Sequence, residues 1–485
     1  MKTTLKILDE INIQFTDLSP ECRRKLITEV EYYVPGAQFS PAVKLGRWNG
    51  KQSYFDLAGR SYLNLLDRLL PIVHNHGYEV EIDDRRNAEP LFDFDDVDEN
   101  SYSHLTWPKG HPIEGKPIII KDHQIEIINS YLNNLAGIRT TPTGGGKTLI
   151  CAILSHKVQK YGRTIVIVPT KDLVTQTEED YKNLGLDVGV FFGDRKEYMK
   201  THTICTWQSL ESLNKKSKKY DLEIDITSFF NNVKCIIIDE THRASGKVLQ
   251  GLLGGPLANV PIRWGLTGTM PESDIDRVAI LACIGPQFGA VNTKDLQDKG
   301  ILAKLNINVL QLQDKLAPVT NNYQAELKWL TTTKPRLTFI AESIDIISKS
   351  GNTLVLVDRI ETGKLLEQMI PDSVFVSGAM SSDDRKAEYK SVQDIDGKVV
   401  IATYSVASTG INIVRIFNLV LIEAGQSFVR VIQSIGRSLR VAPDKDSAEV
   451  YDICSSTKYS KKHLTKRKKI YAEAQYIFSV KKVTY

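Results

Sequence analysis

The sequence is poor in cysteine and has no pair of cysteines at metal-binding or redox spacing. No CxxC motif occurs in the chain, which excludes the common zinc ribbons and dithiol redox centres. Isolated cysteines of this kind are typical of reduced core residues in a cytosolic protein. The six are Cys22, Cys151, Cys205, Cys235, Cys283 and Cys454. We therefore expect neither a disulfide nor a zinc site.

Long apolar runs are missing as well. The N-terminus has no apolar segment typical of signal peptides, and no run approaches the roughly 20 apolar residues of a membrane span. The excess of positive charge is small, at +4. Such a charge does not by itself indicate a nucleic-acid partner, because basic residues must cluster to bind a polyanion. We expect a protein that stays in the cytoplasm where it is made.

The sequence does have the length and composition of a multidomain globular protein. It contains 485 residues, of which 42% are hydrophobic and 25% charged, and such a length predicts two or three domains. Apolar strands alternate with helical segments, which predicts an α/β fold with parallel sheets. The expected boundaries are 1–100 for a small α/β accessory domain, 101–295 and 296–455 for two lobes, and 456–485 for a basic C-terminal extension.

The segment 141–148, with the sequence TPTGGGKT, has the residues of a phosphate-binding loop. Consecutive glycines permit positive φ and let backbone N–H groups point at an anion, and a helix predicted over 149–160 adds its N-terminal partial charge. Lys147 would reach the β and γ phosphates, and the Thr148 hydroxyl would hold Mg²⁺. Thr141 stands where the first glycine is usual, and the alternative is an ordinary glycine-rich turn. The expected phosphate contacts are Thr143, Gly144, Gly145, Gly146 and Lys147.

Acidic residues follow a strand predicted over 233–238, which is apolar except for Lys234. Asp239 at the strand's carboxyl end would bind Mg²⁺ through water, and Glu240 would polarise the water that attacks the γ phosphate. His242 completes an Asp-Glu-Thr-His group, for which the alternative is a plain turn. A later strand end, Thr267 to Thr269, is rich in hydroxyls and would link hydrolysis to contact with a nucleic acid.

Other residues near predicted strand ends and helix starts are further binding candidates. Gln124, just upstream of the glycine-rich loop, has an amide that can recognise the adenine edge, although a surface helix residue is the alternative. Pro169 and Thr170 follow one predicted strand, and Thr206 and Gln208 follow another. The strand ends of a parallel sheet are where ligands bind.

The second half of the chain repeats the strand and helix alternation without a second glycine-rich phosphate loop. Gln433, Arg437 and Arg440 fall on one predicted helix, where the two arginines share a face. Arginines from a lobe without its own phosphate site are suited to act as an arginine finger across a cleft. The alternative is a basic helix that faces solvent.

The N-terminal 100 residues contain a basic loop and an acidic stretch. Lys44, Arg47 and Lys51 surround Trp48, a combination that suits a DNA backbone and an unpaired base. Alternatively, Trp48 is a core residue and the cations form a solvated rim. The acidic stretch Asp93 to Glu99 is predicted to be a solvated linker.

Together these motifs resemble those of superfamily 2 helicases, in their order and spacing, over residues 120–455. Residues 141–148 resemble motif I, 239–242 a DExH motif II, and 267–269 motif III, which departs from the commoner Ser-Ala-Thr. Residues 169–170 and 206–209 resemble DNA-contact motifs, 403–412 motif V and 433–440 motif VI. The resemblance implies two RecA-like lobes, ATP and Mg²⁺. It also implies nucleotide contacts from Gly410, Asn412 and Gln433, a nucleic-acid contact from Thr403, and catalytic roles for Arg437 and Arg440.

A narrower similarity concerns the leading domain. The segments 39–41, 46–50 and 75–78 resemble those of phage UvsW-type recombination helicases. That resemblance implies a motor that unwinds and branch-migrates forked or four-way DNA, moves 3′ to 5′, works in the host cytoplasm and meets recombination or single-strand-binding proteins. An RNA or RNA–DNA helicase and the motor subunit of a restriction-type complex are the alternatives.

Overall fold

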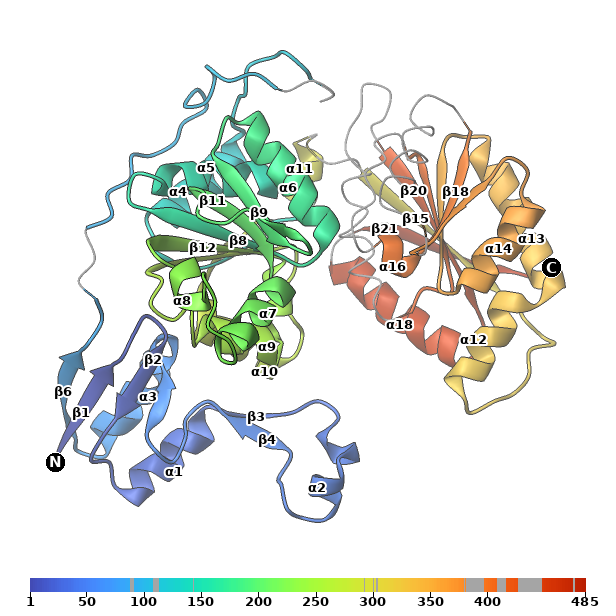
Figure 1. The fold of residues 1–485 in the computed structure, drawn as a ribbon. Coiled ribbons are helices and arrows are strands. Elements are labelled where there is room, and N and C mark those ends of the chain that lie inside the picture. The colour runs from blue at the N-terminus through green and yellow to red at the C-terminus, as the bar shows by residue number, and fades with distance from the viewer. Residues whose placement is uncertain are drawn as a thin grey trace. The chain divides into compact units, whose positions relative to one another are not determined.

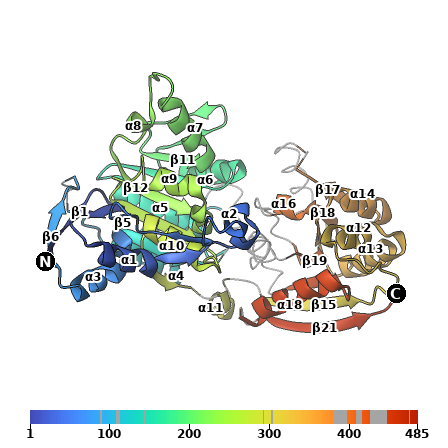
Figure 2. The ribbon, with the colours of Figure 1, turned by 90° about the horizontal axis from the view of Figure 1, so that it is seen from below.

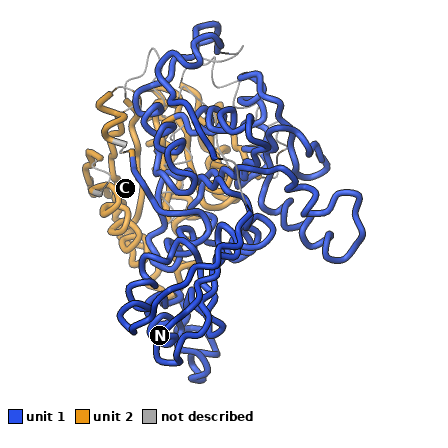
Figure 3. The backbone as a smooth tube through the Cα atoms, turned by 90° about the vertical axis from the view of Figure 1, so that its left-hand side faces the viewer, with its two compact units in different colours: residues 1–141, 146–290 blue, residues 142–145, 291–485 orange. Residues whose placement is uncertain are grey.

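The computed structural model describes residues 1–87, 91–107, 113–142, 144–291, 293–299, 301, 304–378, 380, 397–407, 416–425, 447–473 and 476–485. The chain divides into two compact units, which comprise residues 1–141 with 146–290 and residues 142–145 with 291–485 (Figure 3). Both contain parallel sheets covered by helices, so the predicted α/β class with two RecA-like lobes is confirmed. Among the described residues, no helix combines the length and the apolar composition that a bilayer span requires.

The chain begins with a small α/β domain around a four-stranded sheet of order β5-β2-β1-β6. Side chains alternate between buried and accessible along β1 because one face of the sheet packs on helices. Ser19 caps α1 by accepting a hydrogen bond from the Cys22 amide at 3.2 Å, with Pro20 at the first helical position. The elements are β1 (Lys2–Ile7), β2 (Asn12–Phe15), α1 (Pro20–Glu29), β5 (Arg60–Tyr62), η2 (Leu63–Leu65), α3 (Leu66–Asn75) and β6 (Glu79–Asp84).

A hairpin extends from this domain. Its strands β3 (Glu31–Tyr33) and β4 (Lys51–Ser53) pair in antiparallel fashion and enclose η1 (Ala37–Phe39) and α2 (Pro41–Lys44). We call residues 33–51 the knob. In Figure 1 the knob lies away from α1 and from the four-stranded sheet.

The first RecA-like lobe is built on an eight-stranded sheet of order β10-β9-β11-β8-β12-β13-β7-β14. Every residue of β8 is buried, as expected for a central parallel strand with helices on both faces. Its strands are β7 (Ala136–Thr140), β8 (Arg163–Val168), β9 (Val188–Phe192), β10 (Arg195–Lys196), β11 (His202–Thr206), β12 (Val233–Asp239), β13 (Ile262–Thr267) and β14 (Gln287–Ala290). Its helices are α4 (Asp122–Leu132), α5 (Lys147–Val158), α6 (Lys171–Asn183), α7 (Trp207–Ser217), α8 (Ile226–Phe229), η3 (Thr241–Ser245), α9 (Lys247–Leu253) and α10 (Asp274–Ile284).

Helix α10 of this lobe lies beside the N-terminal domain (Figure 2), and the two share a hydrophobic core. Ile275, Ala279 and Ala282 belong to the same cluster of buried side chains as Leu5, Phe15 and Leu69 of the N-terminal domain. The Tyr54 hydroxyl donates a hydrogen bond to the Ile275 carbonyl at 3.1 Å. The accessory domain is therefore fixed to the first lobe by apolar packing.

The second lobe is a seven-stranded parallel sheet of order β17-β18-β16-β19-β20-β15-β21. The segment 456–485, expected as a basic extension, contributes α18 and the edge strand β21 to this lobe. Arg467 of α18 is buried and pairs with Asp452 of β20 at 2.8 Å, which fastens the helix to the sheet. The strands are β15 (Lys304–Leu312), β16 (Thr353–Val357), β17 (Val374–Val376), β18 (Val399–Thr403), β19 (Asn418–Ile422), β20 (Ser447–Ser455) and β21 (Ile477–Val483). The helices of this unit are α11 (Thr293–Asp298), α12 (Tyr323–Thr332), α13 (Lys334–Ser348), α14 (Ile360–Met369), α16 (Tyr404–Ala407) and α18 (Lys458–Glu473).

Residues 91–107, which include the predicted solvated linker, form an ordered strap on the first lobe. Phe92 and Phe94 pack edge-on against Tyr161, with ring centroids at 5.1 and 5.4 Å. Val97 is buried and exchanges two hydrogen bonds with the Asn129 side chain, at 2.8 and 2.9 Å. The acidic residues of 93–99 are exposed, as expected of a solvated segment, but the apolar residues that alternate with them pack on the lobe, which the sequence did not predict.

Candidate nucleotide-binding and catalytic site

The glycine-rich loop connects the end of β7 to the start of α5. Gly144 and Gly146 have φ angles of 87° and 85°, the left-handed region that residues with a Cβ avoid. Gly146 is the residue from which α5 begins. A Cβ at Gly146 would lie 2.1 Å from the Nε2 atom of Gln124, so the Gln124 side chain would have to move to admit a larger residue. The loop thus has the backbone conformation that the phosphate-binding interpretation requires.

Gln124 lies at the third position of α4 and is only 6% exposed. Its Oε1 atom accepts a hydrogen bond from the Lys121 amide at 3.0 Å, which caps the helix. The close approach of its Nε2 atom to Gly146 shows that the side chain lies beside the phosphate loop. The structure therefore brings these two predicted nucleotide contacts together, while recognition of the base by Gln124 stays a prediction.

Lys147 and Glu240 form an ion pair between the start of α5 and the end of β12. The Lys147 Nζ atom lies 3.1 Å from Glu240 Oε1, and Lys147 is 7% exposed. Burial by itself would raise the pKa of Glu240, but Lys147 and then His242 lower it, and the net pKa is well below the usual range. Glu240 is therefore a carboxylate at neutral pH, as a residue that orients a nucleophilic water must be.

The backbone around Glu240 is unusual. Glu240 has a left-handed conformation, with φ 53° and ψ 51°, and its amide donates a hydrogen bond to Asp239 Oδ1 at 2.9 Å. Non-glycine residues in this region are concentrated at functional sites, because the surrounding structure must offset the strain. Asp239 and Glu240 follow a strand whose preceding residues 235–238 are buried, so β12 presents both carboxylates, half-buried, at the edge of the sheet.

Asp239 and Thr148 are the predicted magnesium ligands, and both are half-buried. Within the described part of the chain, no group of three or more His, Cys, Asp or Glu side chains could hold a metal ion by itself. Mg²⁺ usually takes one or two protein oxygens and completes its octahedron with water and phosphate, so Thr148 and Asp239 would be enough to hold it.

His242 connects the acidic group to the next strand end. Its Nδ1 atom lies 3.0 Å from the Thr267 hydroxyl oxygen, and that hydroxyl donates to the Thr269 carbonyl at 2.8 Å. The Thr267 oxygen therefore accepts, and His242 Nδ1 carries the proton. The same nitrogen lies 3.3 Å from Glu240 Oε2. His242 thus links the Glu240 carboxylate to the hydroxyl-rich segment 267–269. That this segment couples hydrolysis to nucleic-acid contact stays a prediction.

Two buried polar atoms at this site, Thr141 Oγ1 and His242 Nε2, make no hydrogen bond within the described residues. Glu240 Oε2 has the 3.3 Å contact with His242 Nδ1 but no hydrogen bond of good geometry. Buried polar atoms are usually paired, and exceptions concentrate where a ligand or water completes the site. Together with the cation of Lys147 and the start of α5, these atoms show that the residues present fit a nucleoside triphosphate and its attacking water.

The comparisons with known proteins identify the family. The family model for the type III restriction enzyme res subunit matches residues 117–272, and the model for the helicase conserved C-terminal domain matches residues 337–442. The ATP-dependent DNA helicase uvsW of Enterobacteria phage T4 is 26% identical over 499 residues, covering 96% of this chain and 95% of its own. The chain belongs to the superfamily 2 helicases. Members of this superfamily hydrolyse ATP, and so does this helicase.

Further relatives agree on the lobes of the helicase. The DNA 3′-5′ translocase XPB2 of Sulfurisphaera tokodaii is 29% identical over 216 residues, covering 44% of each chain. The fold is that of the DEAD-box helicase Mss116 bound to ssRNA, with a TM-score of 0.54, 15% identity and coverage of 76% of this chain and 75% of that one. The type ISP restriction-modification enzyme LlaBIII bound to DNA gives a TM-score of 0.56 at 13% identity, covering 84% of this chain and 33% of that one.

The predicted nucleic-acid contacts of the helicase lobes lie at strand ends, as expected. Thr170 caps α6 and Thr206 caps α7, each accepting a backbone N–H bond at 3.4 Å. Thr206 is 4% exposed, so its hydroxyl serves the helix, whereas Gln208 in the next turn is exposed. Pro169 is buried, and Thr403 is buried with its hydroxyl 3.0 Å from that of Ser405. Their contacts with nucleic acid stay predictions.

The basic loop of the N-terminal domain lies within the knob. Lys44, Arg47 and Lys51 are exposed. Trp48 is half-buried, and its indole Nε1–H donates to the Lys51 carbonyl at 2.7 Å. Trp48 therefore braces the knob, and it is neither a fully exposed ring nor part of the domain core.

Several predicted residues lie outside the described part of the structure. They are Thr143 of the phosphate loop and the second-lobe residues Gly410, Asn412, Gln433, Arg437 and Arg440. Their roles stay predictions from the sequence.

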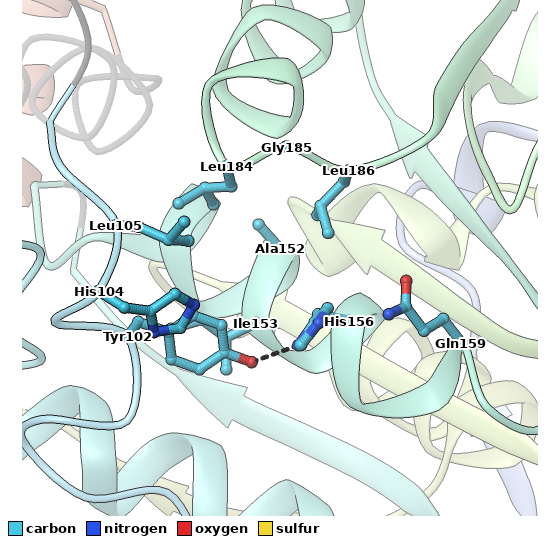
Figure 4. A pocket seen from close by; sticks show the side chains of 10 residues that line it. All are labelled: Tyr102, His104, Leu105, Ala152, Ile153, His156, Gln159, Leu184, Gly185 and Leu186. Atoms are coloured by element: carbon cyan, nitrogen blue, oxygen red, sulfur yellow. Dashed lines mark hydrogen bonds between the residues drawn. The ribbon is translucent and has the colours of Figure 1, made fainter.

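Sequence reasoning missed a cavity on the first lobe, which lies at the end of α5 away from the phosphate loop (Figure 4). Its volume is about 150 Å³, and it is lined by Tyr102 and Leu105 of the strap, His156 of α5 and Leu186 after α6. The Tyr102 hydroxyl lies 2.7 Å from His156 Nδ1, and burial lowers the pKa of that histidine. Since the phosphate loop adjoins the first residue of α5 and this cavity adjoins its last turn, the two are separate.

Proposed function

We propose that this helicase is an ATP-driven DNA motor that unwinds and branch-migrates forked or four-way DNA in recombination, repair and replication restart. The observation that carries the proposal is the Lys147–Glu240 pair beside a left-handed glycine loop, an arrangement that supports ATP hydrolysis at this site. DNA as the track is supported by the T4 helicase uvsW, which matches nearly the whole chain and is named a DNA helicase.

The described residues have separate tasks in the hydrolysis that we propose. Bound ATP with Mg²⁺ supplies the γ-phosphate and the cation that neutralises charge as the phosphoryl group leaves. Lys147 exchanges its ion pair with Glu240 for the phosphates, which frees the carboxylate to orient water. Thr148 and, through water, Asp239 would hold the cation. His242 keeps Glu240 connected to Thr267, so a change at one strand end is transmitted to the other.

Residues from the second lobe complete the proposed motor. Arg437 and Arg440 would stabilise charge in the transition state, and Gln433, Gly410 and Asn412 would contact the nucleotide. Thr403 would contact the DNA, together with Pro169, Thr170, Thr206 and Gln208 of the first lobe. Lys44, Arg47, Trp48 and Lys51 of the knob would give a further contact to DNA backbone and bases.

Two substitutions test the chemistry. Lys147→Ala removes the phosphate-binding cation, and Glu240→Gln removes the carboxylate that orients water, so each should lower ATP turnover by about a hundredfold or more. DNA binding should stay within about twofold of wild type, because neither residue belongs to the proposed DNA surface. Near-normal turnover in either variant would refute the site assignment.

The nucleic-acid track needs a parallel measurement. ATP turnover of the wild-type protein should be stimulated by single-stranded DNA more than by RNA of the same sequence, and forks and four-way junctions should be unwound. Stimulation by RNA alone would favour an RNA helicase. Turnover without any unwinding by the isolated chain would favour the motor subunit of a larger complex.

A further inference from the structure

The knob exposes large apolar side chains on a small projecting module. Phe39 is 73% exposed, Leu45 is 65% exposed and Tyr33 is 50% exposed. Single apolar residues on a surface need no explanation. Three of them within one hairpin, next to cations, form a specific surface whose use can be derived from its frame and its charge.

The frame of the knob is stiff. At its tip the amides of Arg47 and Trp48 both donate to the Ala42 carbonyl, at 2.8 and 3.2 Å. At its base, Trp48 Nε1 donates to the Lys51 carbonyl. Gly50, with φ 79°, leaves no room for a Cβ, which would lie 3.0 Å from the Tyr33 ring. The exposed side chains are therefore held outward by a fixed backbone and are not folded onto the domain.

The charge of the knob has one sign. No aspartate or glutamate occurs between residues 32 and 55. Lys44 and Arg47 are exposed on either side of Leu45, and within the described residues neither makes an ion pair. The nearest acidic residue in the sequence, Glu31, is engaged at the base by Lys51 and Asn49, both at 3.1 Å. A stiff apolar tip flanked by cations is complementary to a nucleic acid with unpaired bases, because the phosphates attract the cations and the base faces stack on apolar side chains. An acidic groove on a protein has the charge but offers no base faces for stacking.

We propose that the knob is a strand-separating wedge, in which Phe39 and Leu45 occupy the point where two DNA strands part and Lys44 and Arg47 hold the flanking phosphates. This inference rests on the proposed function, since it requires a DNA track. Phe39 stacks on the last base pair or on the first unpaired base, and Leu45 blocks its partner from pairing again. Gly50 is a positioning residue, and Trp48, besides its proposed DNA contact, also positions the tip through its bond to the Lys51 carbonyl.

The wedge is tested with a variant that keeps its frame. In Phe39→Ala/Leu45→Ala the exposed side chains are lost without unpacking a core, so the thermal unfolding temperature should not change. Unwinding of a forked duplex should fall about tenfold or more, as expected for the loss of stacking on one base. ATP turnover on single-stranded DNA should remain normal. Phe39→Tyr keeps an aromatic ring and should keep unwinding.

A matched control separates the wedge from general surface effects. Leu57 is 75% exposed in the same domain but lies outside the knob, so Leu57→Ala should unwind normally. Lys44→Ala/Arg47→Ala should weaken fork binding. The slope of log affinity against log salt concentration should fall by the amount expected for about two lost phosphate contacts. Unwinding at saturating protein concentration should be largely kept.

The outcomes distinguish the two proposals. If Phe39→Ala/Leu45→Ala unwinds as fast as wild type, or if Leu57→Ala loses as much unwinding activity as the double variant, the wedge proposal is wrong. Neither result would contradict the proposal of a DNA motor. A wild-type protein that neither responds to DNA nor unwinds it would instead refute the proposed function.

Discussion

Gly146 carries two independent constraints, a left-handed backbone and contact with Gln124. Gly146→Ala would place a methyl group 2.1 Å from Gln124 Nε2 and force an L-residue into φ 85°. The backbone conformation alone costs about 1–2 kcal/mol. We expect ATP affinity to fall about tenfold or more, measured by nucleotide titration, because the loop must distort to accept the side chain.

The control for that prediction is Gly251→Ala in α9. Nothing lies within 4 Å of a Cβ at Gly251, and its φ is not positive. Alanine should therefore be tolerated there and stabilise the helix by up to about 1 kcal/mol. ATP affinity equal to wild type in Gly146→Ala would show that the loop adopts another conformation when it binds nucleotide.

His202 should make the stability of the first lobe sensitive to acid. It is fully buried in β11, and burial, with a smaller effect of His156, lowers its pKa from 6.5 to about 4. Between these pH values the unfolded chain binds a proton that the folded chain does not, so the free energy of unfolding falls as pH falls. The slope from this residue is about 1.4 kcal/mol per pH unit.

Replacing His202 with a side chain that does not titrate tests this directly. In His202→Gln the free energy of unfolding, measured by urea denaturation, should decline less steeply than wild type between pH 6.5 and 4. Above pH 7 the two curves should run parallel, whatever their offset. Equal slopes in acid would show that His202 is protonated in the folded protein.

At the scale of elements, the strap 91–107 should stabilise the first lobe without taking part in chemistry. Phe92→Ala/Phe94→Ala removes the two rings that pack on Tyr161, and Phe94 also lies 6.4 Å, between ring centroids, from Trp264. We expect a loss of about 1–3 kcal/mol in unfolding free energy, with ATP turnover at 25 °C unchanged. The exposed Asp96→Ala is the control and should be neutral. A normal melting temperature in the double variant would mean that the strap detaches in solution.

The packing of the N-terminal domain on α10 also determines which experiments are informative. Deleting residues 1–100 would expose Ile275, Ala279 and Ala282, which are buried in the shared core. Such a truncation would confuse loss of DNA contact with loss of lobe stability. Point substitutions on the exposed knob avoid this problem.

At the scale of the whole molecule, catalysis should need both lobes. If Arg437 stabilises the transition state more than the ground state, Arg437→Ala should lower kcat about a hundredfold or more with little change in ATP affinity. The exposed Lys349→Ala, also on the second lobe, should leave kcat unchanged. A normal kcat in Arg437→Ala would assign the finger to another residue, with Arg440 the next to test.

The sequence by itself determined the local chemistry of this protein. The loop 141–148 and the acidic group 239–242 are continuous segments, so their glycines, lysine and carboxylates could be assigned roles before any fold was known. The alternation of strands and helices likewise predicted two parallel sheets, because periodicity and turn residues act over a few positions.

Only the tertiary structure decided how distant residues meet. Lys147 and Glu240 are 93 positions apart, and their pairing depends on β7 and β12 lying in one sheet. The His242–Thr267 bond, the contact of Gln124 with Gly146, the strap and the core shared with α10 are likewise long-range contacts. Trp48 shows the same limit, since composition suggested an exposed or a buried ring, while the hairpin made it a brace. Sequence patterns encode local propensity, whereas burial and pairing are properties of the packed chain.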